Sequence, residues 1–131
     1  MQFSTKAEYG LRAIIRIARS IEKKPYSLAQ IAKEEGISLA YLERLIAKLK
    51  RAKLVRSTKG VKGGYKLAKE ARKITAKDIL IALEGSLAPY QCVGVGSILC
   101  SHKGCATKKV WHKLQEQIIK TLNSITLADL L

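Results

Sequence analysis

The chain contains three cysteines, Cys92, Cys100 and Cys105, within 14 residues of one another. They lie in or directly after a glycine-rich stretch, and residues 86–105 are called the cysteine segment below. An odd number of cysteines in one segment of a chain expected in the cytosol argues against structural disulfides. The pattern favours metal binding, an iron–sulfur cluster or thiol chemistry, with three unligated side chains as the remaining alternative.

The cysteines supply three ligands, with the spacing C-x7-C-x4-C. Iron–sulfur clusters normally take four ligands, mostly Cys thiolates, with His replacing Cys in some of them. His102 lies between the second and third cysteines and is one candidate for the fourth position. Zinc accepts the same set of three Cys and one His, so zinc, a thiol switch or no cofactor stay open as alternatives. His112 is expected to be an ordinary surface or interface residue.

Positive charge is concentrated in the first half of the chain. The net charge is +15, and residues 1–75 carry 19 Lys/Arg against 6 Asp/Glu, whereas residues 76–131 carry 6 against 4. This segregation indicates a polyanion-binding module joined to a nearly neutral element. No apolar run reaches the ~18 residues of a membrane span, and the start of the chain does not read as a signal peptide, so we expect a cytoplasmic protein without a membrane partner.

Helical periodicity and capping residues predict a helix-turn-helix in the basic half. A first helix is expected over about 5–20, beginning with a capping box of Thr5 and Glu8. A second begins with a capping box at 27–30 and ends at Gly36. Ser38 is expected to cap a third helix, because an inward apolar face follows it at Leu42, Leu45, Ile46 and Leu49. Two helices joined by a tight Gly-Ile turn are typical of a helix-turn-helix.

The residues after the third helix predict a wing. Short strands at 54–58 and 65–67 flank a basic, glycine-rich tip at 59–64. A further helix is expected from about 75 to 85, followed by the cysteine segment. We therefore predict a mainly α fold: a winged helix-turn-helix over 1–75, and a cysteine loop with a long helix over 76–131, in one compact unit.

The long helix is expected at about 106–123, with a short capped turn after it. Its apolar stripe comprises Val110, Trp111, Leu114, Ile118, Ile119 and Leu122. No later segment is large enough to cover this stripe, so the sequence predicts that it packs against a second copy of the chain in a homodimer.

The outward face of the third helix is the predicted DNA-reading surface, because a helix fits the major groove of double-stranded DNA. Arg44 is suited to guanine and Glu43 to cytosine, while Ala40 and Ala47 permit close approach. Arg51, Ser38 and Tyr41 are placed at the same interface, with Tyr41 on a phosphate. At the wing tip, Lys59, Gly60 and Lys62 are expected at the minor groove or its phosphates. The alternative is an ordinary solvated helix face.

Four stretches of the chain carry a resemblance to a known family. They are Met-Gln-Phe-Ser-Thr-Lys-Ala-Glu-Tyr (1–9), Gly-Ile-Ser-Leu-Ala-Tyr-Leu-Glu (36–43), Gly-Val-Lys-Gly-Gly-Tyr-Lys-Leu (60–67), and the ending from Val-Trp (110–111) to Ile-Thr-Leu-Ala-Asp-Leu (125–130). Over essentially its whole length the chain resembles the iron–sulfur cluster regulator (IscR-like) family, which includes regulators of nitric-oxide response and cysteine metabolism. The resemblance implies a dimeric winged-helix regulator with a cluster, of the 2Fe–2S type, on the three cysteines.

The fourth ligand implied by the resemblance is not obvious in this chain. The family spacing is nearer C-x5-C-x5-C, and its histidine three residues after the last cysteine is replaced here by Lys108, which cannot ligate while protonated. Other members use an acidic residue near the start of the first helix of the partner subunit, and Glu8 matches that position. Glu8 or His102 is therefore the expected ligand, with the capping box as the alternative role of Glu8.

Three functions follow from these patterns. The first is a transcription regulator that senses through an iron–sulfur cluster. The second is a regulator of the same family without a cofactor, or one responding through thiols or zinc, for example in cysteine metabolism. The third is an enzyme or electron carrier, which is disfavoured because the chain shows no second chemical constellation, no phosphate loop and no acid–base pair. We therefore expect a non-enzyme.

Overall fold

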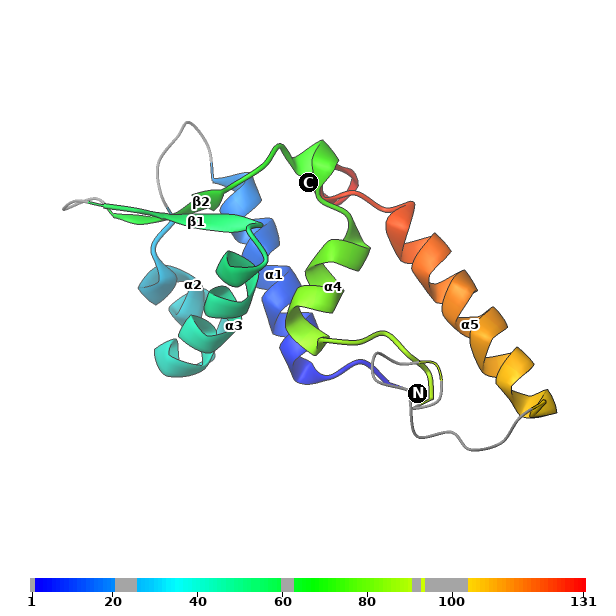
Figure 1. Ribbon diagram of the computed structural model, residues 1–131. Coiled ribbons are helices and arrows are strands. Elements are labelled where there is room, and N and C mark those ends of the chain that lie inside the picture. The colour runs from blue at the N-terminus through cyan, green and yellow to red at the C-terminus, as the bar shows by residue number, and fades with distance from the viewer. Residues whose placement is uncertain (1, 21–25, 60–62, 91–92, 94–103) are drawn as a thin grey trace.

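The computed structural model describes residues 2–20, 26–59, 63–90, 93 and 104–131 (Figure 1). Its elements, in chain order, are α1 Thr5–Arg19, α2 Leu28–Glu35, α3 Leu39–Arg51, β1 Val55–Thr58, β2 Gly64–Leu67, η1 Ala71–Lys73, α4 Ala76–Glu84, α5 Ala106–Asn123 and η3 Leu127–Leu130. The strands form an antiparallel hairpin in which Val55 pairs with Leu67 and Thr58 with Gly64. The predicted order of helix-turn-helix, wing and long helix is therefore present.

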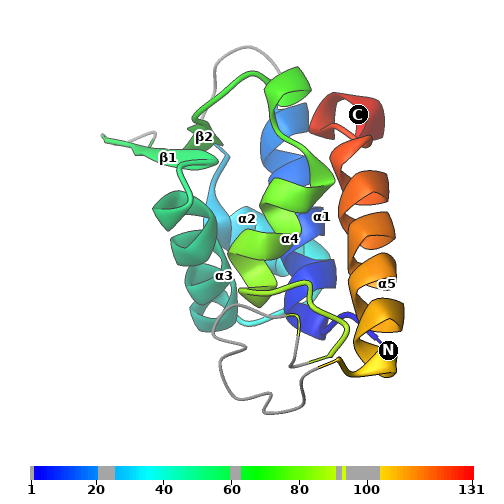
Figure 2. The ribbon, with the colours of Figure 1, turned by 45° about the vertical axis from the view of Figure 1, so that its right-hand side comes forward.

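The core lies where α1, α2, α3 and α4 meet. The inward face of α3 is completely covered, with exposures of 1% or less for Leu42, Leu45, Ile46 and Leu49. The hairpin projects from one side of this core, and α5 stands on the opposite side, beside α4 (Figures 1 and 2). The side chain of Leu127 belongs to the same core. Its N–H donates a hydrogen bond to the carbonyl of Ile74 at 2.7 Å. The expected division at residue 75 stays a prediction.

Some of the predicted helix caps form as expected. The Ser38 Oγ accepts a hydrogen bond from the N–H of Tyr41 at 3.1 Å, and Gly36 has the left-handed φ of 67° that ends α2. Thr75 starts α4 with a complete capping box to Asp78. These caps depend on neighbours within one turn, which is why the sequence alone indicates them.

The two capping boxes predicted from the sequence, at Thr5 and at residues 27–30, are wrong. The N-cap of α1 is Ser4 and not Thr5, and the N–H and Oγ of Ser4 both donate to Glu84 at the end of α4. Ser27 is the N-cap of α2, but its side chain makes no capping bond. At Ser4 a tertiary partner 80 residues away competes successfully with the local partner, which a local pattern cannot reveal.

Helices α1 and α4 cross at very close range because Gly10 has no side chain. A Cβ at this position would lie 2.4 Å from the Leu83 side chain, whose exposure is 0%. Any larger residue would force α4 away from α1. The position of the end of α4, where the cysteine segment begins, is therefore set by this crossing.

The apolar stripe of α5 is covered at one end by its own chain. Ile118 and Leu122 pack on a small cluster formed by Ala7, Leu80 and Leu87. The expectation that nothing within the chain covers this stripe is therefore wrong at its C-terminal end, because α4 presents Leu80 to it. The N-terminal part remains open, with 59% exposure at Val110 and 39% at Leu114. None of the described helices is long and apolar enough to cross a membrane.

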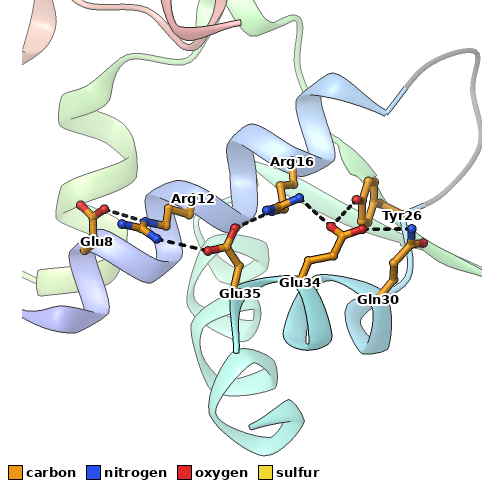
Figure 3. Close-up of polar contacts among 7 residues, drawn as sticks. All are labelled: Glu8, Arg12, Arg16, Tyr26, Gln30, Glu34 and Glu35. Carbon is orange, nitrogen blue, oxygen red and sulfur yellow. Dashed lines mark hydrogen bonds and ion pairs between the residues drawn. The ribbon is translucent and has the colours of Figure 1, made fainter. Parts of the chain in front are cut away.

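A network of ion pairs joins α1 to α2 (Figure 3). Arg12 binds Glu8 at 2.7 Å and Glu35 at 3.4 Å, and Arg16 binds Glu35 and, at 2.6 Å, Glu34. The Glu35 side chain is only 8% exposed, and its hydrogen bond from Arg16 lowers the pKa of the carboxyl group. The network holds α2 against α1, so it fixes the first helix of the helix-turn-helix.

We predict that Glu35→Gln lowers the free energy of unfolding by about 1–2 kcal/mol at neutral pH, because the amide cannot replace the charged partner of Arg16. Since the pKa of Glu35 is lowered in the folded state, this contribution is complete above its ordinary pKa and is lost as pH falls through the lowered value. Urea unfolding of both proteins across this pH range measures the difference. Glu70→Gln, at an exposed ion pair, is the control and should change stability by less than ~0.5 kcal/mol. If the difference in free energy of unfolding between the unaltered protein and Glu35→Gln increased on acidification, the stabilising role given to the Glu35 carboxylate would be contradicted.

Candidate nucleic-acid interface and cysteine segment

The predicted reading face of α3 is exposed along its whole length. Ala40, Glu43, Arg44, Ala47 and Arg51 all face solvent, because the four buried leucine and isoleucine positions occupy the opposite side of the helix. Within the described residues, Arg44 and Arg51 form no ion pair, so their guanidinium groups remain available to a ligand. The arrangement suits insertion of α3 into a groove that displays hydrogen-bond acceptors.

The start of α3 is held in place by two aromatic rings. Tyr41 is half-buried, and its ring meets that of Tyr9 edge to face, with centroids 6.3 Å apart. The Ser38 Oγ already accepts the Tyr41 N–H, but its own proton is free to be donated. Tyr41 and Ser38 therefore position the helix, and their predicted contacts with DNA stay predictions.

The wing is closed by Thr58. Its Oγ1 donates to the carbonyl of Gly64 at 3.1 Å and accepts the N–H of the same residue at 3.0 Å. Lys59 follows this closure and is exposed. Gly60 and Lys62, the other predicted residues of the tip, lie outside the described residues.

Ion pairs neutralise one basic face of the molecule and leave another basic. Arg12 and Arg16 on α1 form ion pairs with carboxylates of α1 and α2. Exposed cations around α3 and the hairpin, among them Lys50 and Arg56, have no acidic partner among the described residues. The Lys50 Nζ instead donates to Ser57 Oγ on β1 at 3.2 Å. Lys50 cannot be singled out from the sequence, because only the fold shows which lysines stand beside the hairpin.

Cys105 begins the long helix. It occupies the N-cap position of α5, and its Sγ lies 3.0 Å from Thr107 Oγ1. Hydrogen bonds from the Thr107 side chain, then from the backbone N–H groups of Thr107 and Lys108, lower the pKa of the Cys105 thiol. The thiolate is the form that binds iron or zinc and that reacts with oxidants, so Cys105 fits a metal ligand or a reactive thiol.

The other predicted ligands are distributed as follows. Cys92, Cys100 and His102 lie outside the described residues. Glu8 is exposed on α1 and binds Arg12, so its expected capping role with Thr5 is wrong. Among the residues the structure places, no group of three Cys, His, Asp or Glu side chains lies close enough to hold a metal. The cluster shell as a whole therefore stays a prediction.

An aromatic contact joins the two sides of the cysteine segment. The rings of Tyr90 and Trp111 stack with centroids 5.4 Å apart and planes 22° apart. Tyr90 precedes Cys92, and Trp111 lies on α5 after Cys105. The residues that flank the three cysteines are thus brought to one place beside α5.

These features agree with what is known of other proteins. Residues 3–131 match the family model Rrf2, described as an iron-dependent transcriptional regulator. The chain belongs to the Rrf2 family. A curated relative of this Rrf2-family chain, Protein rrf2 of Nitratidesulfovibrio vulgaris, is 37% identical over 131 residues, which is 100% of this chain and 87% of that protein. The transcriptional regulator IscR of Klebsiella pneumoniae is 36% identical over 99% of this chain and 79% of its own length.

Solved structures show the same fold. The global cysteine regulator CymR of B. subtilis matches with a TM-score of 0.81 and 35% identity, over 99% of this chain and 95% of that one. IscR of T. potens matches with a TM-score of 0.80 and 40% identity, over 99% and 85% of the two chains. The predicted winged-helix class and family resemblance are therefore confirmed. This Rrf2-family chain is a DNA-binding transcription regulator, and its IscR and CymR relatives are named as regulators.

Proposed function

We propose that this Rrf2-family chain is a homodimeric transcription regulator whose affinity for its operator depends on an iron–sulfur cluster held by Cys92, Cys100 and Cys105. The observation that carries the proposal is the position of Cys105, which stands at the N-cap of α5 with a lowered thiol pKa. When bound, the cluster supplies iron that can react with oxidants or small gases. A regulator of DNA acts beside the DNA, so we place the chain in the cytoplasm.

The contacts around α4 explain how the cysteine segment could influence DNA reading. The segment begins where α4 ends and finishes where α5 begins. At the end of α4, the carbonyl of Leu83 accepts a hydrogen bond from Lys48 Nζ on α3 at 3.2 Å. A ligand bound by the cysteine segment therefore acts next to an element that α3 also binds, which is the kind of shared element that a switch requires.

The absorption spectrum of anaerobically purified protein, with iron and sulfide counts, tests the cluster. We expect a visible chromophore of the 2Fe–2S type that disappears on oxidation together with a change in operator affinity. Glu8→Ala and His102→Ala distinguish the two candidate fourth ligands, because only loss of the true ligand alters the spectrum. A colourless protein that takes up no iron on reconstitution would contradict the proposal.

A second candidate function is a regulator controlled by the Cys105 thiol itself, without a cluster. The lowered pKa of this thiol favours oxidation at neutral pH, and one structural relative is an oxidised form of CymR of Staphylococcus aureus, with 35% identity and a TM-score of 0.78. Zinc on the same thiols is a variant of this candidate. Operator binding that responds to peroxide in iron-free, zinc-free protein would support it.

We predict that Arg44→Ala lowers operator affinity by about 1–3 kcal/mol and relaxes specificity at one base position, because a side chain at this exposed site can donate two bonds to guanine. Binding to operator variants with each base changed in turn measures the effect. Lys59→Ala is the comparison, since loss of a phosphate contact weakens all sequences alike. An equal loss on operator and random DNA for Arg44→Ala would exclude base reading.

A further inference from the structure

Helices α3 and α4 lie side by side (Figure 2), and a pocket of about 390 Å³ opens between their C-terminal ends. It is called the α3–α4 pocket below. Its walls carry Lys48, Arg51 and Ala52 from the end of α3 and Ala82, Leu83 and Glu84 from the end of α4. None of its lining residues belongs to the hairpin. A pocket of this volume is large enough for a small metabolite.

The wall from α3 supplies two cations with free hydrogen-bond donors. Arg51 is exposed and forms no ion pair within the described residues, so its planar guanidinium group can bind a carboxylate through two parallel hydrogen bonds. Lys48 is half-buried, and its ammonium group gives one N–H to the carbonyl of Leu83 at 3.2 Å. The other two N–H donors of Lys48 have no acceptor among the residues that the structure places. This wall is therefore suited to a carboxylate.

The wall from α4 supplies the opposite charge. Glu84 accepts both hydrogen bonds from Ser4 on its Oε1 atom, which leaves Oε2 without a donor in the described part of the chain. The carbonyls of Ala82 and Glu84 also accept no hydrogen bond from the described residues. Unpaired carbonyls at the end of a helix carry a partial negative charge. This wall is therefore suited to an ammonium group.

The charges and the apolar lining together define the ligand. Ala52, Ala82 and Leu83 offer an apolar surface beside the charged groups. We propose that the α3–α4 pocket binds a small aliphatic α-amino acid, whose carboxylate meets Arg51 and whose ammonium group meets Glu84. A simple anion would be repelled by the carboxylate of Glu84, and a simple cation would face two positive side chains. A zwitterion with an apolar side chain matches both walls.

An amino acid in this pocket affects DNA binding through Arg51. Arg51 lies on the exposed face of α3 that is predicted to contact DNA, so the amino acid and DNA compete for one guanidinium group. The bound amino acid therefore lowers operator affinity, and by linkage DNA lowers the affinity for the amino acid by the same factor. This regulation needs no cysteine, but it rests on the predicted DNA contact of Arg51.

Isothermal titration calorimetry of the full chain tests the pocket with three probes: L-leucine, 4-methylpentanoate, which lacks the amine, and 3-methylbutylamine, which lacks the carboxylate. Leucine should bind about tenfold more tightly than either analogue, because each analogue loses one charged contact. Arg51→Gln should weaken leucine binding about tenfold. Glu84→Gln should weaken leucine but not 4-methylpentanoate, since the amide oxygen still accepts from Ser4. Arg56→Gln, at an exposed arginine of β1, is the control and should leave leucine binding unchanged.

Titrations of an operator duplex, selected from a random library, with and without saturating leucine test the regulation. Leucine should weaken operator binding of the unaltered protein about three- to tenfold and leave that of Arg51→Gln unchanged. The proposal is overturned if leucine does not bind at ~10 mM, if 4-methylpentanoate binds as tightly as leucine, or if leucine leaves operator affinity unchanged. None of these results involves the chromophore or the Arg44→Ala effect, so they would not contradict the proposed function.

Discussion

Replacing both Val110 and Leu114 by Glu will dissociate the proposed homodimer into folded monomers that have lost most of their operator affinity. These two side chains are the open end of the α5 stripe, with exposures of 59% and 39%. Burying two carboxylates without partners in a dimer interface should raise the dissociation constant of the dimer at least ~100-fold, roughly 3 kcal/mol. In separate monomers the two winged helix-turn-helix units bind DNA independently. The gain in affinity that comes from linking them, about 10²–10⁴, is then lost.

Sedimentation velocity and DNA binding measure this result, and circular dichroism checks the fold. Lys113→Glu places the same charge on an exposed position of α5 and should leave the dimer intact. The double variant Ile118→Glu, Leu122→Glu should dissociate the proposed dimer. It should also lower the melting temperature, because these two side chains pack on the cluster of Ala7, Leu80 and Leu87 in their own chain. A Val110→Glu, Leu114→Glu protein that sediments as a dimer would contradict the role given to this face.

Cys105→Ala will abolish the chromophore of the proposed cluster and the proposed response of operator binding to reconstitution with iron and sulfide, and we expect the same of Cys92→Ala and Cys100→Ala. Loss of one thiolate leaves a cluster with too few ligands, so iron content should fall to background. The fold and the proposed dimer should survive Cys105→Ala, since this half-buried residue makes its side-chain contact with Thr107 and lies outside the core clusters. The spectrum, the iron count and operator titrations with and without iron and sulfide provide the readouts.

Thr107→Val supplies a matched variant for this prediction. It removes the hydrogen bond that contributes most to lowering the pKa of Cys105, but it keeps the thiol. The pKa should therefore rise towards its ordinary value, and alkylation of iron-free protein at neutral pH should slow. The cluster should still assemble on Thr107→Val. If a protein lacking all three cysteines bound operator with unchanged affinity and kept its response to iron and sulfide, the cluster proposal would be wrong.

The order and type of the structural elements were predictable from the sequence, because they depend on local patterns. Leu42, Leu45, Ile46 and Leu49 recur at helical spacing, and that spacing alone defines the buried face of α3 and the exposed face opposite. Gly36 and Ser38 act within one turn of their own helices. The grouping of the three cysteines within 14 residues is also a property of the chain itself.

The polar partners of the charged side chains were decided by the tertiary structure. The sequence has 25 Lys and Arg, and nothing in a local pattern distinguishes Arg16, which is bound by Glu35, from Arg44, which faces solvent. Lys50 meets Ser57 only because the hairpin folds back beside α3.

The same reason explains the predictions that failed. Ser4 binds Glu84, and Ile118 packs on Leu80, because α1, α4 and α5 converge on a crossing that Gly10 permits. Local sequence determines which backbone conformations are favourable and which faces are apolar, since those terms depend on neighbours three or four residues away. Which faces and charges then meet depends on how closely whole helices can approach, and that is fixed only when the core is packed.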